Sequence, residues 1–155
     1  MDHSEFRSLL TASIVHLLTP HCSAARLSRD RLFQRLGNDL AAANLLMEDV
    51  DAAIETLVAE GTVEEAGAGY QLTKAGLIAT RPPGDEMTGM AVQVRRDQKR
   101  MGGMKCPGRE GVVVSENTFG RNSPGGLWNV RLDATKRAGE RIDTFWGTEL
   151  DKIDR

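Results

Sequence analysis

The stretch MEDVDAAIETLVAEGTVEEAGAGYQLTKAG, residues 47–76, decides the fold of the N-terminal half of this 155-residue chain. In its first part, apolar side chains recur at the i, i+4, i+7 and i+8 positions, which are Val50, Ile54, Leu57 and Val58. This spacing predicts a helix from about Met47 to Glu60 with one buried face, ended by Gly61. Two short strands, 62–66 and 70–73, are predicted to follow, because a glycine-containing turn separates them.

Two more helices are predicted before this stretch. From Ser4 to Leu18 apolar residues recur at three- and four-residue steps, and Pro20 stops the pattern. A second helix is predicted to begin after Ser28, which suits an N-cap, and to end at Gly37. Its apolar face consists of Leu32, Phe33 and Leu36.

The order of three helices and a β-hairpin resembles the winged-helix domains of bacterial proteins. The resemblance rests on an L-x-x-x-G-x-V helix end at residues 57–63 and an L-T-x-x-G wing closure at residues 72–76, and it covers about residues 4–80. It implies a winged helix of three helices plus a hairpin wing. Some winged helices bind DNA and others bind proteins, so the resemblance leaves both functions open.

Three carboxylates lie on one side of the predicted third helix, at Glu48, Asp51 and Glu55. In winged helices that bind DNA this helix enters the major groove, where such a surface would repel the phosphates. We therefore interpret these three residues as a candidate surface for a basic protein partner, with a solvated acidic face as the alternative. The arginines nearby are either a second cationic surface or a solvent face; they are Arg26, Arg29, Arg31 and Arg35.

Residues 81–88, RPPGDEMT, are predicted to link two domains, 1–80 and 89–155. The two prolines lack backbone donors and disfavour a helix, and a glycine follows them. The net charge changes sign at the same place. Residues 1–80 contain 6 Lys and Arg against 11 Asp and Glu, a net charge of −5, whereas residues 81–155 contain 14 against 11, a net charge of +3. The two domains are therefore expected to have different electrostatic roles.

The C-terminal domain is predicted to be a small β-barrel. Runs rich in β-branched residues, separated by turn residues, predict strands at 91–95, 111–115, 127–132 and 141–146. In the third of these strands, one face is predicted to be buried in the core and the opposite face, called the wet face below, to be exposed to solvent. The core face consists of Trp128, Val130 and Leu132, and the wet face of Asn129, Arg131 and Asp133.

Three segments of this domain resemble SH3-like barrels of the KOW type. They are the glycine turn and valine strand at residues 107–113, the W-x-V-R sequence at residues 128–131, and the short helical closure at residues 145–150. The resemblance covers about residues 89–152. It implies a binding module for nucleic acid or for a protein, and it supplies no catalysis.

The densest positive charge of the chain lies between the first two predicted strands, in residues 95–109. Two glycines in this segment would let it bend around a phosphate backbone. The alternative is a solvated loop, because the run itself has no aromatic residue for base stacking. The candidate nucleic-acid-binding residues are Arg95, Arg96, Lys99, Arg100, Lys105, Arg109 and Arg131.

No motif in the chain points to catalysis, a cofactor or a metal. Gly102-Gly103 is not a P-loop, because no Gly-Lys-Ser/Thr follows at the required spacing. One short segment holds three potential ligands, but no carboxylate pair accompanies them, and a capping turn is the better interpretation. These ligands are His16, His21 and Cys22.

The remaining sulfur-containing residues and the hydropathy pattern indicate an ordinary intracellular protein. Two cysteines, Cys22 and Cys106, are too few for a disulfide framework, and Met101 and Met104 are interpreted as loop anchors. The chain has no apolar run of the length that a membrane helix needs, and its N-terminus is charged where a signal peptide would be apolar. We expect a cytoplasmic location and no membrane partner.

Together these patterns predict an α+β protein, with an N-terminal winged helix and a C-terminal SH3-like β-barrel. The function favoured by the sequence is that of a nucleic-acid-associated regulator or adaptor without enzymatic activity, with DNA favoured over RNA. The alternative is a protein-interaction module that uses the acidic helix face, such as an accessory or inhibitory factor of a mobile element. A homodimer remains open in both cases.

Overall fold

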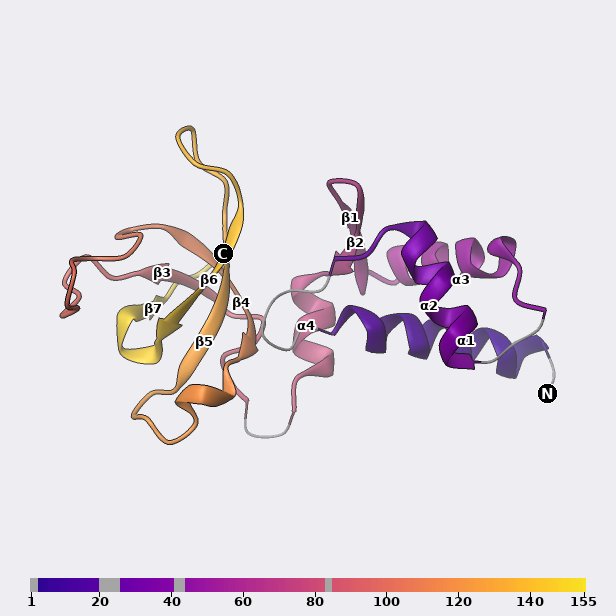
Figure 1. Cartoon of the computed structure of the whole chain (residues 1–155), viewed down its shortest axis with the longest axis horizontal. Coiled ribbons are helices and arrows are strands. Elements are labelled where there is room, and N and C mark those ends of the chain that lie inside the picture. The colour runs from indigo at the N-terminus through magenta and orange to yellow at the C-terminus, as the bar shows by residue number, and fades with distance from the viewer. Residues whose placement is uncertain (1–2, 20–25, 41–43, 83–84) are drawn as a thin grey trace. The chain divides into compact units, whose positions relative to one another are not determined.

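The chain divides into two compact units, which are drawn in Figure 1. The computed structural model describes residues 3–19, 26–40, 44–82 and 85–155. The division falls between Ala79 and Thr80. The described residues form a mixed α+β structure, in which helices and a hairpin make up the first unit and an antiparallel sheet the second.

The first unit consists of helices followed by a β-hairpin and a short helix, as Figure 1 shows. Its elements are α1 (His3–Leu18), α2 (Arg29–Leu40), α3 (Met47–Ala59), β1 (Val63–Ala66), β2 (Gly69–Leu72) and α4 (Lys74–Thr80). The three predicted helices and the hairpin are therefore confirmed. Pro20, His21 and Cys22, which the sequence analysis placed in a turn, lie outside the described residues.

The helices are held together by the apolar faces that their periodicity predicts. α1, α2 and α3 all pack against one another. Their fully or almost fully buried side chains are Leu10, Ile14, Leu18, Leu32, Leu36, Val50, Ala53, Ile54 and Leu57. The prediction that Val58 belongs to the buried face is wrong, because its side chain is 44% exposed. Val58 is about 80° around the helix from Val50, at the edge of the buried stripe.

The predicted limits of α2 are right at its start and wrong at its end. Ser28 caps the helix, since its Oγ accepts a hydrogen bond from the Arg31 amide at 3.2 Å. The helix continues past Gly37 to Leu40. Gly37 ends no helix because it keeps a negative φ, unlike the glycines that adopt the left-handed conformation typical of helix ends.

The hairpin and α4 meet at a glycine that has no room for a side chain. β1 and β2 pair in antiparallel register with a two-residue turn, Gly67-Ala68, whose glycine has φ 58°. Thr73, predicted as a strand residue, instead caps α4, and its Oγ1 accepts a hydrogen bond from the Gly76 amide at 3.0 Å. A Cβ on Gly76 would lie 2.3 Å from the Thr62 carbonyl oxygen, so only glycine fits there.

The second unit is built around a five-stranded antiparallel sheet. Its elements are β3 (Ala91–Val94), β4 (Glu110–Glu116), the 3-10 turn η1 (Thr118–Gly120), β5 (Leu127–Leu132), β6 (Arg141–Trp146), the 3-10 turn η2 (Gly147–Glu149) and β7 (Leu150–Lys152). The strand order is β6-β5-β4-β3-β7, so the last strand returns to pair with the first. The four predicted strands are confirmed, and Leu150 begins a fifth.

One face of this sheet forms an apolar core, as the alternation in β5 predicts. The core consists of Val92, Val94, Val113, Trp128, Val130, Leu132, Phe145 and Leu150. The prediction that Asn129 lies on a wet face is wrong, because its side chain is completely buried. Its amide donates to Ser115 Oγ at 3.0 Å and accepts from Thr144 Oγ1 at 3.0 Å, so polar cross-strand neighbours satisfy it in place of water.

The segment predicted as a linker contributes contacts to the second unit. Asp85 is buried and accepts hydrogen bonds from the amides of Met87 and Thr88, at 3.1 and 3.0 Å. The guanidinium of Arg81 donates to the Thr88 carbonyl at 3.3 Å. Pro83 and Gly84 lie outside the described residues. None of the helices in the described part of the chain combines the length and the apolar character needed to cross a membrane.

Candidate nucleic-acid interface

The basic segment predicted to bind phosphates forms the long loop between β3 and β4, residues 95–109 (the β3–β4 loop). The strand ends close this loop at its base, because Val94 exchanges two backbone hydrogen bonds, with the Arg109 carbonyl and with the Gly108 amide, both at 2.8 Å. Between these ends, several of the loop's cations are paired with carboxylates of the same unit. The loop therefore carries less uncompensated charge than its sequence suggests.

Arg95, at the start of the loop, is held by a local carboxylate. Its guanidinium donates two parallel hydrogen bonds to Asp97, at 2.9 and 3.0 Å, and lies 3.7 Å from an Asp151 oxygen on β7. The hydrogen bond and charge of Arg95 hold the pKa of Asp97 below its ordinary value. Both side chains are exposed to solvent, so the pair orients the loop more than it stabilises the unit.

Arg100 forms the most buried ion pair of the loop. Its guanidinium binds both carboxylate oxygens of Glu149 in η2, one through its NH2 group at 2.6 Å. The Glu149 side chain is only 8% exposed and also accepts the Trp146 amide at 2.9 Å. Burial alone would raise the pKa of Glu149, but the hydrogen bonds from Arg100 and Trp146 and the charge of Arg100 outweigh it and lower that pKa. This ion pair ties the loop to η2.

Lys105 ties the other side of the loop to β6. Its ammonium pairs with Asp143, donates to the Thr144 carbonyl at 2.9 Å and lies 5.0 Å from the centre of the Phe145 ring. Burial would raise the pKa of Asp143, but the hydrogen bonds from Lys105, the Thr144 amide and Arg141 lower it overall. Lys105 is thus a structural cation of the loop.

Two other candidate cations, Arg109 and Arg131, also contact other parts of the second unit. Arg109 donates to the carbonyls of Asp133 and Gly139, at 2.6 and 3.3 Å. Arg131 lies on β5, where it faces Val112 on one neighbouring strand and Ile142 on the other, and it is half-buried. The structure does not gather Arg131 with the β3–β4 loop cations around one pocket.

Arg96 and Lys99 differ from the other cations of the loop. Both side chains are exposed, and within the described part of the chain neither forms an ion pair or a hydrogen bond. The Arg96 guanidinium lies against the backbone of Gly108, so close that a Cβ added to this glycine would come within 2.5 Å of it. These two cations are therefore available to an external anion.

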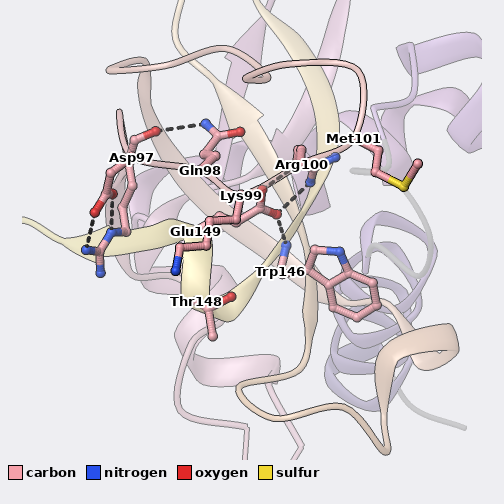
Figure 2. Close-up of a pocket in the computed structure, with 9 residues that line it drawn as sticks. Asp97, Gln98, Lys99, Arg100, Met101, Trp146, Thr148 and Glu149 are labelled. Carbon is pink, nitrogen blue, oxygen red and sulfur yellow. Dashed lines mark hydrogen bonds and ion pairs between the residues drawn. The ribbon is translucent and has the colours of Figure 1, made fainter.

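A pocket of about 640 Å³ lies between the β3–β4 loop and η2, and Figure 2 shows its lining. It is lined by Arg95, Asp97, Gln98, Lys99, Arg100, Met101, Trp146, Thr148 and Glu149. Trp146 and Thr148 were not predicted as members of this site, because they are distant in sequence from the loop. The alternation of Phe145 and Trp146 on β6 was the available signal, since adjacent strand residues face opposite sides.

The prediction that Met101 and Met104 anchor the loop is wrong. Met101 is fully exposed and Met104 is 55% exposed. The ion pairs and the hydrogen bonds of Gln98 hold the loop instead, since the Gln98 amide bridges the Arg95 carbonyl and the backbone of Lys105 at 2.8 Å. Met101 consequently adds apolar surface to the rim of the pocket.

The acidic residues predicted on the third helix are only partly available to a partner. Asp51 accepts two hydrogen bonds from the Arg29 guanidinium, at 2.5 and 2.7 Å, which hold the pKa of this carboxyl below its ordinary value. Glu48 and Glu55 are exposed, and neither has an ion-pair partner among the described residues. The arginines predicted as an alternative cationic surface include Arg26, which instead binds Gln71 at 2.6 Å.

No group of three His, Cys, Asp or Glu side chains within the described ranges is arranged to hold a metal ion. Cys106 is half-buried, and its sulfur accepts a hydrogen bond from Arg141 at 3.2 Å. Compared with protein-family models, curated proteins and solved structures, the chain has no significant match.

Proposed function

We propose that this chain is a nucleic-acid-associated regulator or adaptor, in which the second unit contacts phosphates through the β3–β4 loop. The observation that carries the proposal is that Arg96 and Lys99 remain exposed and unpaired on a loop whose other cations are fixed by internal partners. A loop that is already ordered loses little conformational entropy when it binds, so its free cations are well suited to a polyanion.

The arrangement of the first unit supports a winged-helix fold. Three helices precede the hairpin, and Leu27, between α1 and α2, exchanges two backbone hydrogen bonds with Tyr70 of β2, at 2.8 and 3.1 Å. This bridge adds a third chain segment beside the hairpin, as a winged helix requires. We infer that this unit serves self-association or a contact with DNA.

The arrangement of the second unit supports an SH3-like barrel. Five antiparallel strands follow one another, a 3-10 turn precedes the last strand, and that strand pairs with the first. Such barrels have no catalytic machinery of their own and bind ligands through their loops. We therefore propose binding, without catalysis, as the activity of this unit.

The salt dependence of DNA binding tests the proposed function. Each phosphate contact made by a cation contributes about −0.9 to the slope of log K against log salt on duplex DNA. The double variant Arg96→Ala with Lys99→Ala should therefore flatten the slope of the full chain by up to about 1.8. Fluorescence anisotropy with a labelled duplex, over salt concentrations from about 50 to 200 mM, measures it.

A matched control separates a local contact from a change in net charge. Lys136 and Arg137 are exposed cations of the β5–β6 loop, in the same unit. Lys136→Ala with Arg137→Ala removes the same charge and should leave the slope almost unchanged. Equal slopes for both double variants would contradict the assignment to the β3–β4 loop, and absence of binding at low salt would overturn the proposed function.

The alternative is a protein-interaction module that uses α3. The exposed, unpaired carboxylates of Glu48 and Glu55 favour it, whereas the pairing of Asp51 with Arg29 leaves less negative charge on this face than the sequence suggests. If α3 instead lies near DNA, Glu48→Gln with Glu55→Gln should tighten DNA binding in the same anisotropy assay. If the acidic face is a protein interface, the same change leaves DNA binding unaltered.

A further inference from the structure

Trp146 exposes part of an aromatic face inside the pocket between the β3–β4 loop and η2. It is the last residue of β6, and its neighbour Phe145 points into the core with no exposed surface, so Trp146 faces the opposite side of the sheet. Its side chain is 38% exposed. Figure 2 shows the Trp146 ring and the fully exposed Met101 on the same side of the pocket, so the wall they form is apolar.

The polar groups of the pocket that remain available can each donate a hydrogen bond. The carboxylates of Asp97 and Glu149 are engaged by Arg95 and Arg100. By contrast, the Lys99 ammonium, the Thr148 hydroxyl and the Trp146 indole N–H have no hydrogen-bond or ion-pair partner among the described residues. A ligand that is complementary to this pocket therefore has an apolar planar face for the Trp146 ring and hydrogen-bond acceptors or negative charge for the donors.

We propose that this pocket binds single-stranded nucleic acid, with one base stacked on Trp146 and an adjacent phosphate paired with Lys99. The inference rests on the proposed function and deepens it, because it names the strand state that the second unit recognises. The face of a base in a duplex is covered by its stacked neighbours, whereas an unpaired base offers its face to an aromatic side chain. The volume of about 640 Å³ is in the range of pockets that hold small ligands.

The ion pair between Arg100 and Glu149 fixes the two walls of this pocket relative to each other. Glu149 accepts the Trp146 amide as well as the Arg100 guanidinium, so the tryptophan on β6 and the tip of the loop share one anchor. Both elements belong to the second unit. The stacking platform is consequently formed before a ligand arrives.

Tryptophan fluorescence of the full chain tests the inference directly. The chain has two tryptophans, and the other one, Trp128, is 9% exposed in the core. The probes are a short oligothymidylate, an abasic oligomer of the same length and charge, and a duplex, all at low salt. Stacking should quench Trp146 with the oligothymidylate only, and should make it bind about 5- to 150-fold more tightly than the abasic oligomer.

Three variants separate stacking from a general effect on folding. Trp146→Leu should abolish both the quenching and the preference over the abasic oligomer, while Trp146→Phe should keep part of that preference. Phe119→Leu is the matched control, because Phe119 is a 90% exposed aromatic residue of the same unit that does not line the pocket. If Trp146→Leu does not fold, the comparison of probes on the wild-type chain still decides the question.

The outcomes distinguish this inference from the proposed function. If the chain binds none of the nucleic acids at low salt, both the stacking inference and the proposed function are overturned. If the three probes bind with equal affinity, the stacking inference is overturned and the phosphate contact of the proposed function stands. Quenching of Trp146 by an acidic peptide, with no response to oligothymidylate, would assign the pocket to a protein partner and would overturn the inference.

Discussion

Trp128 and Trp146 show how the face of a strand decides the role of a residue. Trp128 is opposite Phe145 in the register of β5 and β6, lies in the core and donates its indole N–H to the Gly125 carbonyl at 2.8 Å. Trp146 follows Phe145 directly and therefore lies on the other face. The two tryptophans are 9% and 38% exposed. The same residue type thus stabilises the core in one place and remains available for contacts in the other.

At this scale we predict that Trp128→Ala destabilises the second unit by about 3–5 kcal/mol, because it removes a buried ring and leaves a cavity. Trp146→Ala is the matched control and should cost clearly less, since its ring already contacts solvent. Chemical denaturation of the full chain, followed by circular dichroism, measures both. Equal losses for the two variants would show that the assignment of strand faces is wrong.

At the scale of elements, the β3–β4 loop is ordered by ion pairs instead of by an apolar cluster of its own. Its three internal anchors are Arg95 with Asp97, Arg100 with Glu149, and Lys105 with Asp143. Of these, the pair of Arg100 and Glu149 is the most buried. Removing one partner of such a pair leaves the other charge poorly solvated, so the pair matters more for the loop than an exposed pair does.

The lowered pKa of Glu149 predicts an acid-sensitive loop. A carboxyl whose pKa is lower in the folded than in the unfolded chain contributes stability above its ordinary pKa of 4.5 and loses that contribution as the pH falls through the folded-state pKa. Glu149→Gln should therefore lower the melting temperature at neutral pH. Below about pH 4.5, the melting temperature of this variant should fall less steeply than that of the wild type.

Thermal unfolding of the full chain between neutral pH and about pH 3 measures this effect. Glu86→Gln, at an exposed glutamate of the same unit that does not line the pocket, is the control and should keep the wild-type dependence on pH. If the melting temperature of Glu149→Gln shows the same pH dependence as that of the wild type, the ion pair with Arg100 does not contribute to stability.

At the scale of the whole molecule, the two units have separate cores. The buried apolar residues of the first come from α1, α2, α3, the hairpin and α4, while those of the second come from the five-stranded sheet. Because each unit buries its own apolar set, we predict that fragments 1–79 and 80–155 fold independently. The second fragment includes Arg81 and Asp85, whose hydrogen bonds lie within that unit.

Amide proton spectra of the two fragments measure this prediction. Dispersed signals that overlay those of the full chain are expected for each fragment. Collapsed signals from both would show that the cut between Ala79 and Thr80 divides a single cooperative unit.

Local patterns in the sequence predict α1, α2, α3, the hairpin and four strands of the sheet, whereas α4 was not predicted. The positions of Leu10, Ile14 and Leu18 show why: the period of buried side chains is a local property of the helix, so it can be detected in a short window. The same holds for the alternation of Trp128, Val130 and Leu132 on β5. The helix end predicted at Gly37 is wrong, because glycine also fits inside a helix and α2 continues to Leu40.

Which polar residues are buried, paired or free depends on contacts that form only in the folded chain. Asn129 is buried because strand register places Ser115 and Thr144 beside it. Three of the six cations of the β3–β4 loop pair with carboxylates from β6, η2 and β7, and the loop has Trp146 as a neighbour in the pocket. These contacts join residues far apart in the chain. They depend on sheet order and on how the loop closes, and no local period in the sequence records either.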